Sequence, residues 1–304
     1  MKDIFYQELK NKLKENQILL QEKLADHTTL HIGGAADYYI LPTTTQEIRD
    51  VLCLCKEWNM PFYVMGNGSN LLVSDQGYRG LILHFGSEFA KVWVKEDGTV
   101  IAQAGVMLSK LAGEIAKHSL TGFEFASGIP GTLGGAVTMN AGAYDGEIKQ
   151  CIVGAKVMDV EGNIHDLGKE ELELDYRSSV LQKNNYILLE AEFKFISGDI
   201  QTIMQRMNEL NTLRREKQPL DQFSVGSTFK RPKGNYAGKL IMEAGLRGYQ
   251  VGDAAVSEKH SGFVINKGNA TAKDFITVLD DVIRRVYDQF GIRLEPEVKF
   301  LGEF

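Results

Sequence analysis

The chain has 304 residues, of which 43% are hydrophobic and 24% charged, and its formal net charge is -6. It is long enough for two or three globular domains, since domains commonly contain roughly 100 to 150 residues. The acidic balance, without a dense run of Lys and Arg, argues against a nucleic-acid binder. No apolar stretch approaches the roughly 20 residues of a membrane span, so we expect no membrane insertion.

The cysteines are Cys53, Cys55 and Cys151. An odd number cannot all pair, and their spacing is typical neither of a zinc site nor of a redox Cys-x-x-Cys motif. We expect no metal site, and we expect reduced core thiols in a cytoplasmic protein. The N-terminus is amphipathic, carries both signs of charge and lacks an apolar signal core.

The first elements predict a β-α-β unit. Residues 44–58 place apolar side chains at helical spacing, and Thr44 and Glu47 are positioned as a capping box. The strand-like segments ADYYILP and PFYVMG flank this helix.

A glycine-rich loop, GNGSN, follows at residues 66–70, between PFYV and LLV. Two glycines one residue apart let backbone N–H groups converge on an anion. The spacing matches neither the dinucleotide fingerprint nor the P-loop. The loop is therefore either a phosphate cradle between strands or an ordinary hairpin turn.

Residues 80–196 are strand-rich. The predicted strands lie in GLILHF, in KVWVKEDGTVIAQAG with a turn at Asp97-Gly98, in CIVGAKVMDVEGNIHDL with a turn at Gly162-Asn163, and in YILLEAEFKFI. One short helix, LSKLAGEIAKH, interrupts them.

A second glycine-rich segment, SGIPGTLGGAVTMNAGAYDGE, spans Ser127 to Glu147. A glycine costs roughly 0.5 to 1 kcal/mol relative to alanine inside an element, so a dense cluster normally has a steric or ligand reason. The segment is either a ligand-binding backbone or a set of tight turns.

A long helix over residues 199–217 and an α/β region complete the chain. The long helix places five side chains on one face that we expect in the core: Ile200, Ile203, Met204, Met207 and Leu210. A last helix is predicted to begin after Thr271 and to end at Gly291.

The two glycine-rich segments, in this order, resemble the FAD-binding domain of the UDP-N-acetylenolpyruvoylglucosamine reductases, in particular their shorter subclass. The resemblance continues in HTTLHIGGAADYYILP, LDYRSS, VGSTFKRP, AGLRGYQVGDAAVSEKHSGFVIN and LEPEVKFLGE, and it covers nearly everything after residue 25. It implies an α+β fold, with a vanillyl-alcohol-oxidase-like (PCMH-type) FAD-binding domain and an α/β substrate-binding domain.

The resemblance implies three structural parts. Residues 1–80 form an FAD-binding subdomain that the C-terminal segment 292–304 joins. Residues 81–198 form a strand-rich second FAD-binding subdomain, and residues 199–291 form the substrate-binding domain.

It also implies FAD contacts. The first loop is expected to take the FAD pyrophosphate through Gly66, Asn67, Gly68, Ser69, Asn70 and Leu71. The second is expected to pack against the flavin and ribityl chain through Ser127, Gly128, Ile129, Gly131, Thr132, Gly135, Ala136, Asn140 and Gly142. The family binds FAD non-covalently, so His27 and His31 are expected to be structural.

The implied reaction reduces an enolpyruvyl ether of UDP-N-acetylglucosamine to UDP-N-acetylmuramate for bacterial peptidoglycan. NADPH reduces FAD, which then delivers hydride to the carbon beta to the carboxylate. The family motifs place Arg177 on that carboxylate, Ser227 as the proton donor to the alpha carbon, and Glu297 as a protonated acid beside them. A surface arginine and a turn serine are the alternatives for the first two.

Substrate contacts are expected from Arg214, Lys217 and Tyr144. We expect a monomer. Two other functions stay open: a flavin oxidase of the same superfamily, which would lack the catalytic trio, and a non-catalytic module that binds a nucleotide sugar without flavin.

Overall fold

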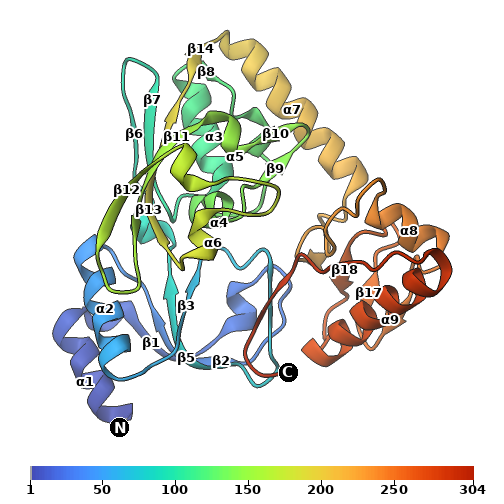
Figure 1. Ribbon diagram of the computed structural model, residues 1–304, viewed down its shortest axis with the longest axis horizontal. Coiled ribbons are helices and arrows are strands. Elements are labelled where there is room, and N and C mark those ends of the chain that lie inside the picture. The colour runs from blue at the N-terminus through green and yellow to red at the C-terminus, as the bar shows by residue number, and fades with distance from the viewer. Residues whose placement is uncertain (1) are drawn as a thin grey trace. The chain divides into compact units, whose positions relative to one another are not determined.

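The structure is a computed structural model that describes residues 2–304, with side chains from residue 4 onward; Met1, where the expected first subdomain begins, lies outside the described residues. Helices and strands mix along the chain (Figure 1), which confirms the α+β class. The helices are α1 (Lys2–Lys12), α2 (Thr45–Glu57), α3 (Leu108–Lys117), α4 (Leu133–Thr138), α5 (Ile148–Cys151), α6 (Val180–Lys183), α7 (Ile200–Lys217), α8 (Ala237–Glu243) and α9 (Ala272–Phe290).

The strands are interleaved with these helices and, with the exceptions of β5, β11 and β13, are six residues long or shorter. They are β1 (Ile18–Lys23), β2 (Ala35–Ile40), β3 (Phe62–Met65), β4 (Leu71–Val73), β5 (Tyr78–His84), β6 (Val92–Val94), β7 (Thr99–Gln103), β8 (Leu120–Thr121), β9 (Gly142–Ala143), β10 (Gly146–Glu147), β11 (Ile152–Met158), β12 (Ile164–Gly168), β13 (Ile187–Lys194), β14 (Ile196–Ser197), β15 (Phe223–Ser224), β16 (Gln250–Val251), β17 (Ala254–Val256), β18 (Val264–Asn266) and β19 (Lys299–Leu301).

The chain forms two compact units, each with its own hydrophobic core. Unit 1 contains the residues up to Leu20, Tyr38–Asn67 and Gly80–Leu213, and unit 2 contains Gln21–Asp37, Gly68–Arg79 and Arg214–Phe304. The three-part division expected from the sequence stays a prediction.

The capping box predicted at the start of α2 is confirmed. Thr44 is the N-cap of α2: its side chain accepts from the Glu47 N–H, and Glu47 Oε2 accepts from the Thr44 N–H at 3.2 Å. The four-stranded sheet has the order β1-β2-β5-β3, so β5 lies between the two strands that flank α2. β3 and β5 pair in parallel, with Phe62 opposite Leu81.

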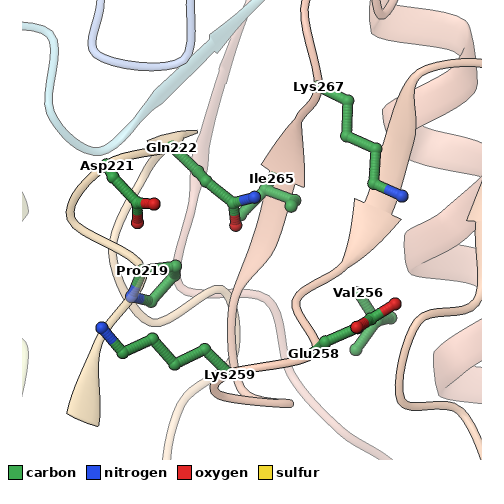
Figure 2. A pocket seen from close by; sticks show the side chains of 8 residues that line it. All are labelled: Pro219, Asp221, Gln222, Val256, Glu258, Lys259, Ile265 and Lys267. Atoms are coloured by element: carbon green, nitrogen blue, oxygen red, sulfur yellow. The ribbon is translucent and has the colours of Figure 1, made fainter. Parts of the chain in front are cut away.

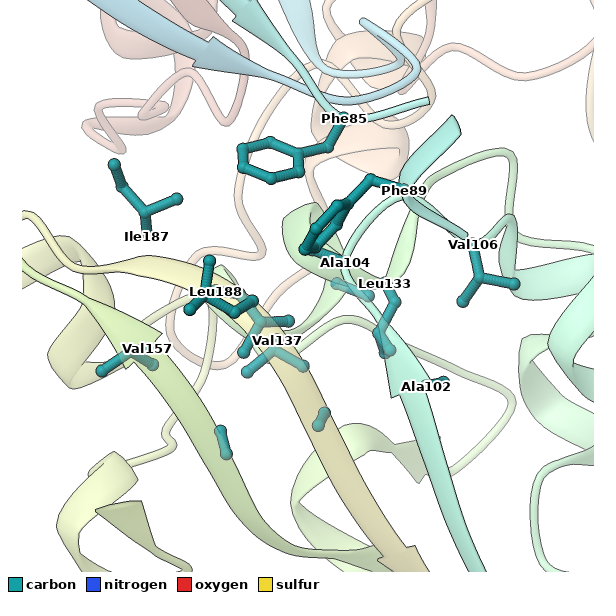
Figure 3. Packing of buried hydrophobic residues seen from close by; sticks show 14 of the residues in the cluster. Phe85, Phe89, Ala102, Ala104, Val106, Leu133, Val137, Val157, Ile187 and Leu188 are labelled. Atoms are coloured by element: carbon teal, nitrogen blue, oxygen red, sulfur yellow. The ribbon is translucent and has the colours of Figure 1, made fainter. Parts of the chain in front are cut away.

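Unit 1 is built on a five-stranded sheet of order β12-β11-β13-β7-β6. Both predicted hairpins are present: β6 pairs with β7 across the Asp97-Gly98 turn, and β11 pairs with β12 across Gly162. Figure 3 shows Leu133 and Val137 of α4 among buried side chains from neighbouring strands, including Leu188 of β13. The apolar side of α4 thus anchors the second glycine-rich segment on the sheet.

Unit 2 contains a four-stranded antiparallel sheet of order β15-β18-β17-β16, against which α9 packs. The predicted limits of α9 are confirmed, because Thr271 caps its first turn and Gly291 adopts φ 67 at its end. Asp75 accepts hydrogen bonds from the first backbone N–H groups of α9, at Ala272 and Lys273. In a separate pairing, β4 runs parallel to β19, with Leu71 opposite Lys299.

Two expectations about buried side chains were wrong. Ile203 and Leu210 of α7 are buried, but Ile200 and Met204 are 39% and 44% exposed, because α7 is covered over only part of its predicted apolar face. Cys53 is exposed on α2, whereas Cys55 and Cys151 are buried. Burial raises the pKa of both buried thiols to about 12.

None of the helices formed by residues 2–304 combines the length and the apolar character that a membrane crossing requires.

Candidate active site

The first glycine-rich loop lies between β3 and β4, as the sequence predicted, and its first half packs on the second glycine-rich segment. A Cβ on Gly66 would lie 2.1 Å from Thr132 Oγ1, so a side chain at this position would collide with Thr132. The Asn67 side-chain amide donates to the Pro130 carbonyl at 2.9 Å. Within unit 1, the two glycine-rich segments therefore meet.

The second half of the first loop belongs to unit 2. Gly68 is buried at φ 57, a conformation that glycine adopts with little strain, and its carbonyl accepts from the Thr29 N–H at 3.4 Å. Asn70 donates through its side-chain amide to the Glu297 carbonyl at 3.1 Å. The Asn70 carbonyl accepts from the Lys299 N–H at 3.0 Å. The loop is thereby fastened to the chain segment around Glu297.

The second glycine-rich segment combines tight turns with a short helix. Ser127 is buried, and its hydroxyl has no hydrogen-bond partner within residues 2–304. Gly135 lies on α4 and is exposed, and apart from its chain neighbours and the backbone of its own helix, no protein atom lies within 4 Å of the position that a Cβ would take. A buried hydroxyl without a partner and an open backbone are features that a bound ligand would explain.

Asn140 holds this segment to the loop that precedes Arg177. It is 1% exposed, and its amide donates to Glu147 Oε2 at 3.0 Å and to the Asp175 carbonyl at 3.2 Å. Its Oδ1 accepts from the Lys149 N–H at 2.9 Å. Both amide hydrogens and one lone pair of Oδ1 are thus used within unit 1.

Arg177 sits in a strained and well-held loop. It has φ 54, in the left-handed region where side chains other than glycine are uncommon. Asp175 and Ser178 exchange two backbone hydrogen bonds of 3.1 Å around it, and Gln182 donates to both the Arg177 carbonyl and the Thr138 carbonyl at the end of α4. The half-buried Arg177 is therefore fixed beside the second glycine-rich segment, as strained functional residues often are.

Ser227 and Glu297 lie on adjacent chain segments of unit 2. The Glu297 N–H donates to the Thr228 carbonyl at 2.8 Å, and Phe229 and Pro296 form an antiparallel bridge next to it. Ser227 itself is exposed and follows Gly226, which has φ 75.

Thr228 was not singled out in the sequence, yet it anchors this arrangement. It is fully buried: its N–H donates to the Gly262 carbonyl at 2.9 Å, and its Oγ1 accepts from the Val264 N–H at 2.8 Å. Together with the bond that its carbonyl accepts from Glu297, these bonds occupy the N–H, the carbonyl and the hydroxyl of Thr228. The sequence offered little signal for this role, because the hydrogen-bond partners of Thr228 lie at least 34 positions away in the chain.

The expected substrate residues are distributed over both units. Arg214 is half-buried and Lys217 exposed in the last turn of α7, in unit 2. Tyr144 has φ 51 in the turn between β9 and β10, in unit 1. A cavity of about 320 Å³ in unit 2 begins just after α7, at Pro219, and is lined by charged side chains that include Asp221, Glu258, Lys259 and Lys267 (Figure 2). None of the predicted site residues lines it.

Comparison with known families and structures defines the class of protein. A model of an FAD binding domain matches residues 36–168, which include both glycine-rich segments. The chain is also similar over 96% of its length to the structure of Phl p 4.0202, a glucose dehydrogenase, with a TM-score of 0.53 and 13% identity, which shows the fold alone. The chain is therefore an FAD-binding protein of this fold.

The remaining matches identify the family. A model of the UDP-N-acetylenolpyruvoylglucosamine reductase C-terminal domain matches residues 218–301. UDP-N-acetylenolpyruvoylglucosamine reductase of Lachnoclostridium phytofermentans is 51% identical over 100% of this chain and 99% of its own, and that of Clostridium botulinum Alaska E43 is 50% identical over 96% of each. The crystal structure of the Thermus caldophilus reductase covers 94% of this chain and 98% of its own, with 34% identity and a TM-score of 0.78. The chain belongs to the UDP-N-acetylenolpyruvoylglucosamine reductase family.

Proposed function

We propose that this protein reduces the enolpyruvyl ether of UDP-N-acetylglucosamine to UDP-N-acetylmuramate, a step of peptidoglycan synthesis, with FAD as cofactor and NADPH as reductant. The observation that carries the proposal is the 51% identity to a reductase of this name over the full chain. We further propose that the protein works as a monomer in the bacterial cytoplasm.

FAD is held, in this proposal, by the two glycine-rich segments. The partnerless Ser127 hydroxyl and the open space over Gly135 support contacts there, since a ligand would satisfy the first and fill the second. Bound FAD would supply the hydride-transfer chemistry that links NADPH to the carbon beta to the substrate carboxylate.

The residues of the chain manage the charge and the proton that accompany this transfer. Negative charge develops on the alpha carbon and the carboxylate, and the planar guanidinium of Arg177 is suited to stabilise it through two parallel hydrogen bonds. Ser227 then gives its proton to the alpha carbon. Glu297 acts as a second acid, which returns a proton to the serine oxygen. Arg214, Lys217 and Tyr144 bind the diphosphate and the remainder of the substrate.

The test follows the two half-reactions separately under anaerobic conditions. NADPH should bleach the flavin absorbance, and the enolpyruvyl substrate should then restore it. Rapid reoxidation by oxygen but not by the substrate would favour the flavin oxidase. Purified protein that is colourless, and stays so after FAD is added, would favour the nucleotide-sugar binding module.

Arg177→Lys tests the guanidinium. Lysine keeps the charge, and it is as disfavoured as arginine in the left-handed backbone conformation of this residue. It lacks the planar guanidinium that can form two parallel hydrogen bonds with a carboxylate. Because a hydrogen bond to a charged group contributes about 1.5 to 3 kcal/mol, we expect reoxidation by substrate to slow about 10- to 100-fold while NADPH reduces the flavin normally. Arg206→Lys, on an exposed part of α7, is the matched control. Near-parent turnover of Arg177→Lys would make Arg177 a surface residue.

A further inference from the structure

The side chain of Asn70 connects the first glycine-rich loop to the segment that carries Glu297. Its Nδ2 donates to the Glu297 carbonyl at 3.1 Å, across 227 positions of sequence. The facing atom is a carbonyl oxygen, which only accepts, so the amide must present its nitrogen there and not its oxygen. The orientation of Asn70 is thereby determined by its partner.

The side-chain oxygen of Asn70 does not suit a phosphate. Asn70 Oδ1 is buried and has no hydrogen-bond partner within residues 2–304. It can only accept a hydrogen bond, and the oxygens of an ionised diphosphate can also only accept. A phosphate on this loop would therefore contact N–H groups and not Asn70 Oδ1, and one N–H of the Asn70 amide is already used by the Glu297 carbonyl.

The backbone N–H and the backbone carbonyl of Glu297 are both hydrogen-bonded. Its N–H donates to the carbonyl of Thr228, the residue after Ser227, and its carbonyl accepts from Asn70. The Lys299 N–H, two residues later, donates to the Asn70 carbonyl at 3.0 Å, where β4 and β19 begin to pair. Removal of the Asn70 amide would take away the hydrogen bond to the Glu297 carbonyl and leave the one from the Glu297 N–H to Thr228 in place.

We propose that Asn70 is a positioning residue for Glu297: its side-chain amide fixes the Glu297 peptide against the Ser227 segment and so sets the acid for the proton transfer. This inference rests on the proposed function, and it gives the Asn70 side chain a role distinct from cofactor binding. A misplacement of a catalytic group by about 1 Å can cost about 100-fold in rate.

The first test is Asn70→Ala in the FAD-loaded protein. We expect retention of FAD on gel filtration, an unchanged circular dichroism spectrum, flavin reduction by NADPH at the parent rate, and reoxidation by substrate slowed about 10- to 100-fold. Asn67→Ala is the matched comparison, because Asn67 also donates to a backbone carbonyl, but to that of Pro130. We expect Asn67→Ala to weaken FAD retention and to leave the ratio of the two half-reaction rates unchanged.

The second test is Asn70→Asp, which keeps the shape of the side chain. An ionised carboxylate cannot donate to the Glu297 carbonyl and repels it, whereas a protonated carboxyl group can donate. The ratio of variant to parent reoxidation rates should therefore rise as the pH is lowered. Taking this ratio at each pH cancels the titration of Glu297 and of other groups that both proteins share, and Asn70→Ala should show no such recovery.

These outcomes separate the inference from the function on which it rests. A parent protein that substrate does not reoxidise would overturn the proposed function. If the parent is reoxidised, the positioning role is overturned by any one of three results: Asn70→Ala reoxidises at the parent rate, it loses its FAD, or the ratio for Asn70→Asp does not depend on pH.

Discussion

Ser227→Ala is expected to bind FAD and to be reduced by NADPH at close to the parent rate, but to be reoxidised by the enolpyruvyl substrate about 10²- to 10⁴-fold more slowly, the usual cost of losing a general acid. The two half-reactions differ because only the second uses the serine proton. Stopped-flow absorbance of the flavin reads each of them separately.

The surroundings of Ser227 allow the effect of Ser227→Ala to be assigned to the lost hydroxyl. Ser227 is exposed, and its hydroxyl makes no hydrogen bond to any of residues 2–304, so alanine removes no structural bond. If Ser227 had only a structural role in a turn, its replacement by alanine would slow both half-reactions or neither. Ser224→Ala, three residues earlier in β15, is the control and should behave as the parent.

Ser227→Cys adds a graded response. A thiol keeps a transferable proton in nearly the same place, so some reoxidation activity should return relative to alanine. Reoxidation of Ser227→Ala at the parent rate would show that another group donates the proton, and water positioned by Glu297 would be the next candidate.

Gly68→Val is expected to release FAD and to leave a folded apoprotein. Valine is strongly disfavoured at positive φ, and its branched Cβ would occupy the space through which a backbone N–H reaches phosphate. The measurement is flavin retention after gel filtration together with circular dichroism. Full flavin occupancy would refute the pyrophosphate assignment of this loop.

The control for Gly68→Val separates backbone strain from ligand contact. Gly291, at the end of α9, has φ 67, and no protein atom other than those of its chain neighbours lies within 4 Å of the position that its Cβ would take. Gly291→Val therefore carries a comparable backbone strain at a residue outside the glycine-rich segments and should retain FAD.

Gly135→Ala tests the second glycine-rich segment with a substitution that should not strain the backbone. Alanine is favoured over glycine in a helix by roughly 0.5 to 1 kcal/mol, and Gly135 has open space around it, so the apoprotein should be as stable as the parent or more so. If the flavin fills that space, FAD affinity should fall. An unchanged affinity would remove Gly135 from the expected contacts.

Local signals in the sequence were sufficient for many elements. The capping pairs of α2 and α9 and the turns at Asp97-Gly98 and Gly162-Asn163 were predicted because the residues that form them are close in sequence. The periodicity of α7 also gave a correct helix. It could not show that Ile200 and Met204 stay exposed, since burial depends on what packs against a helix.

The sequence by itself thus determined the element types, the two glycine-rich segments and, through family motifs, the reaction class. Only the tertiary structure decided that Asn70 and Thr228 hold the Glu297 peptide, that Thr132 is why Gly66 must lack a side chain, and that Asn140 ties the second segment to the Arg177 loop. The physical reason is sequence separation. A hydrogen bond between residues 227 positions apart leaves no periodicity, cap or turn signal, and it exists only when the fold brings the two segments together.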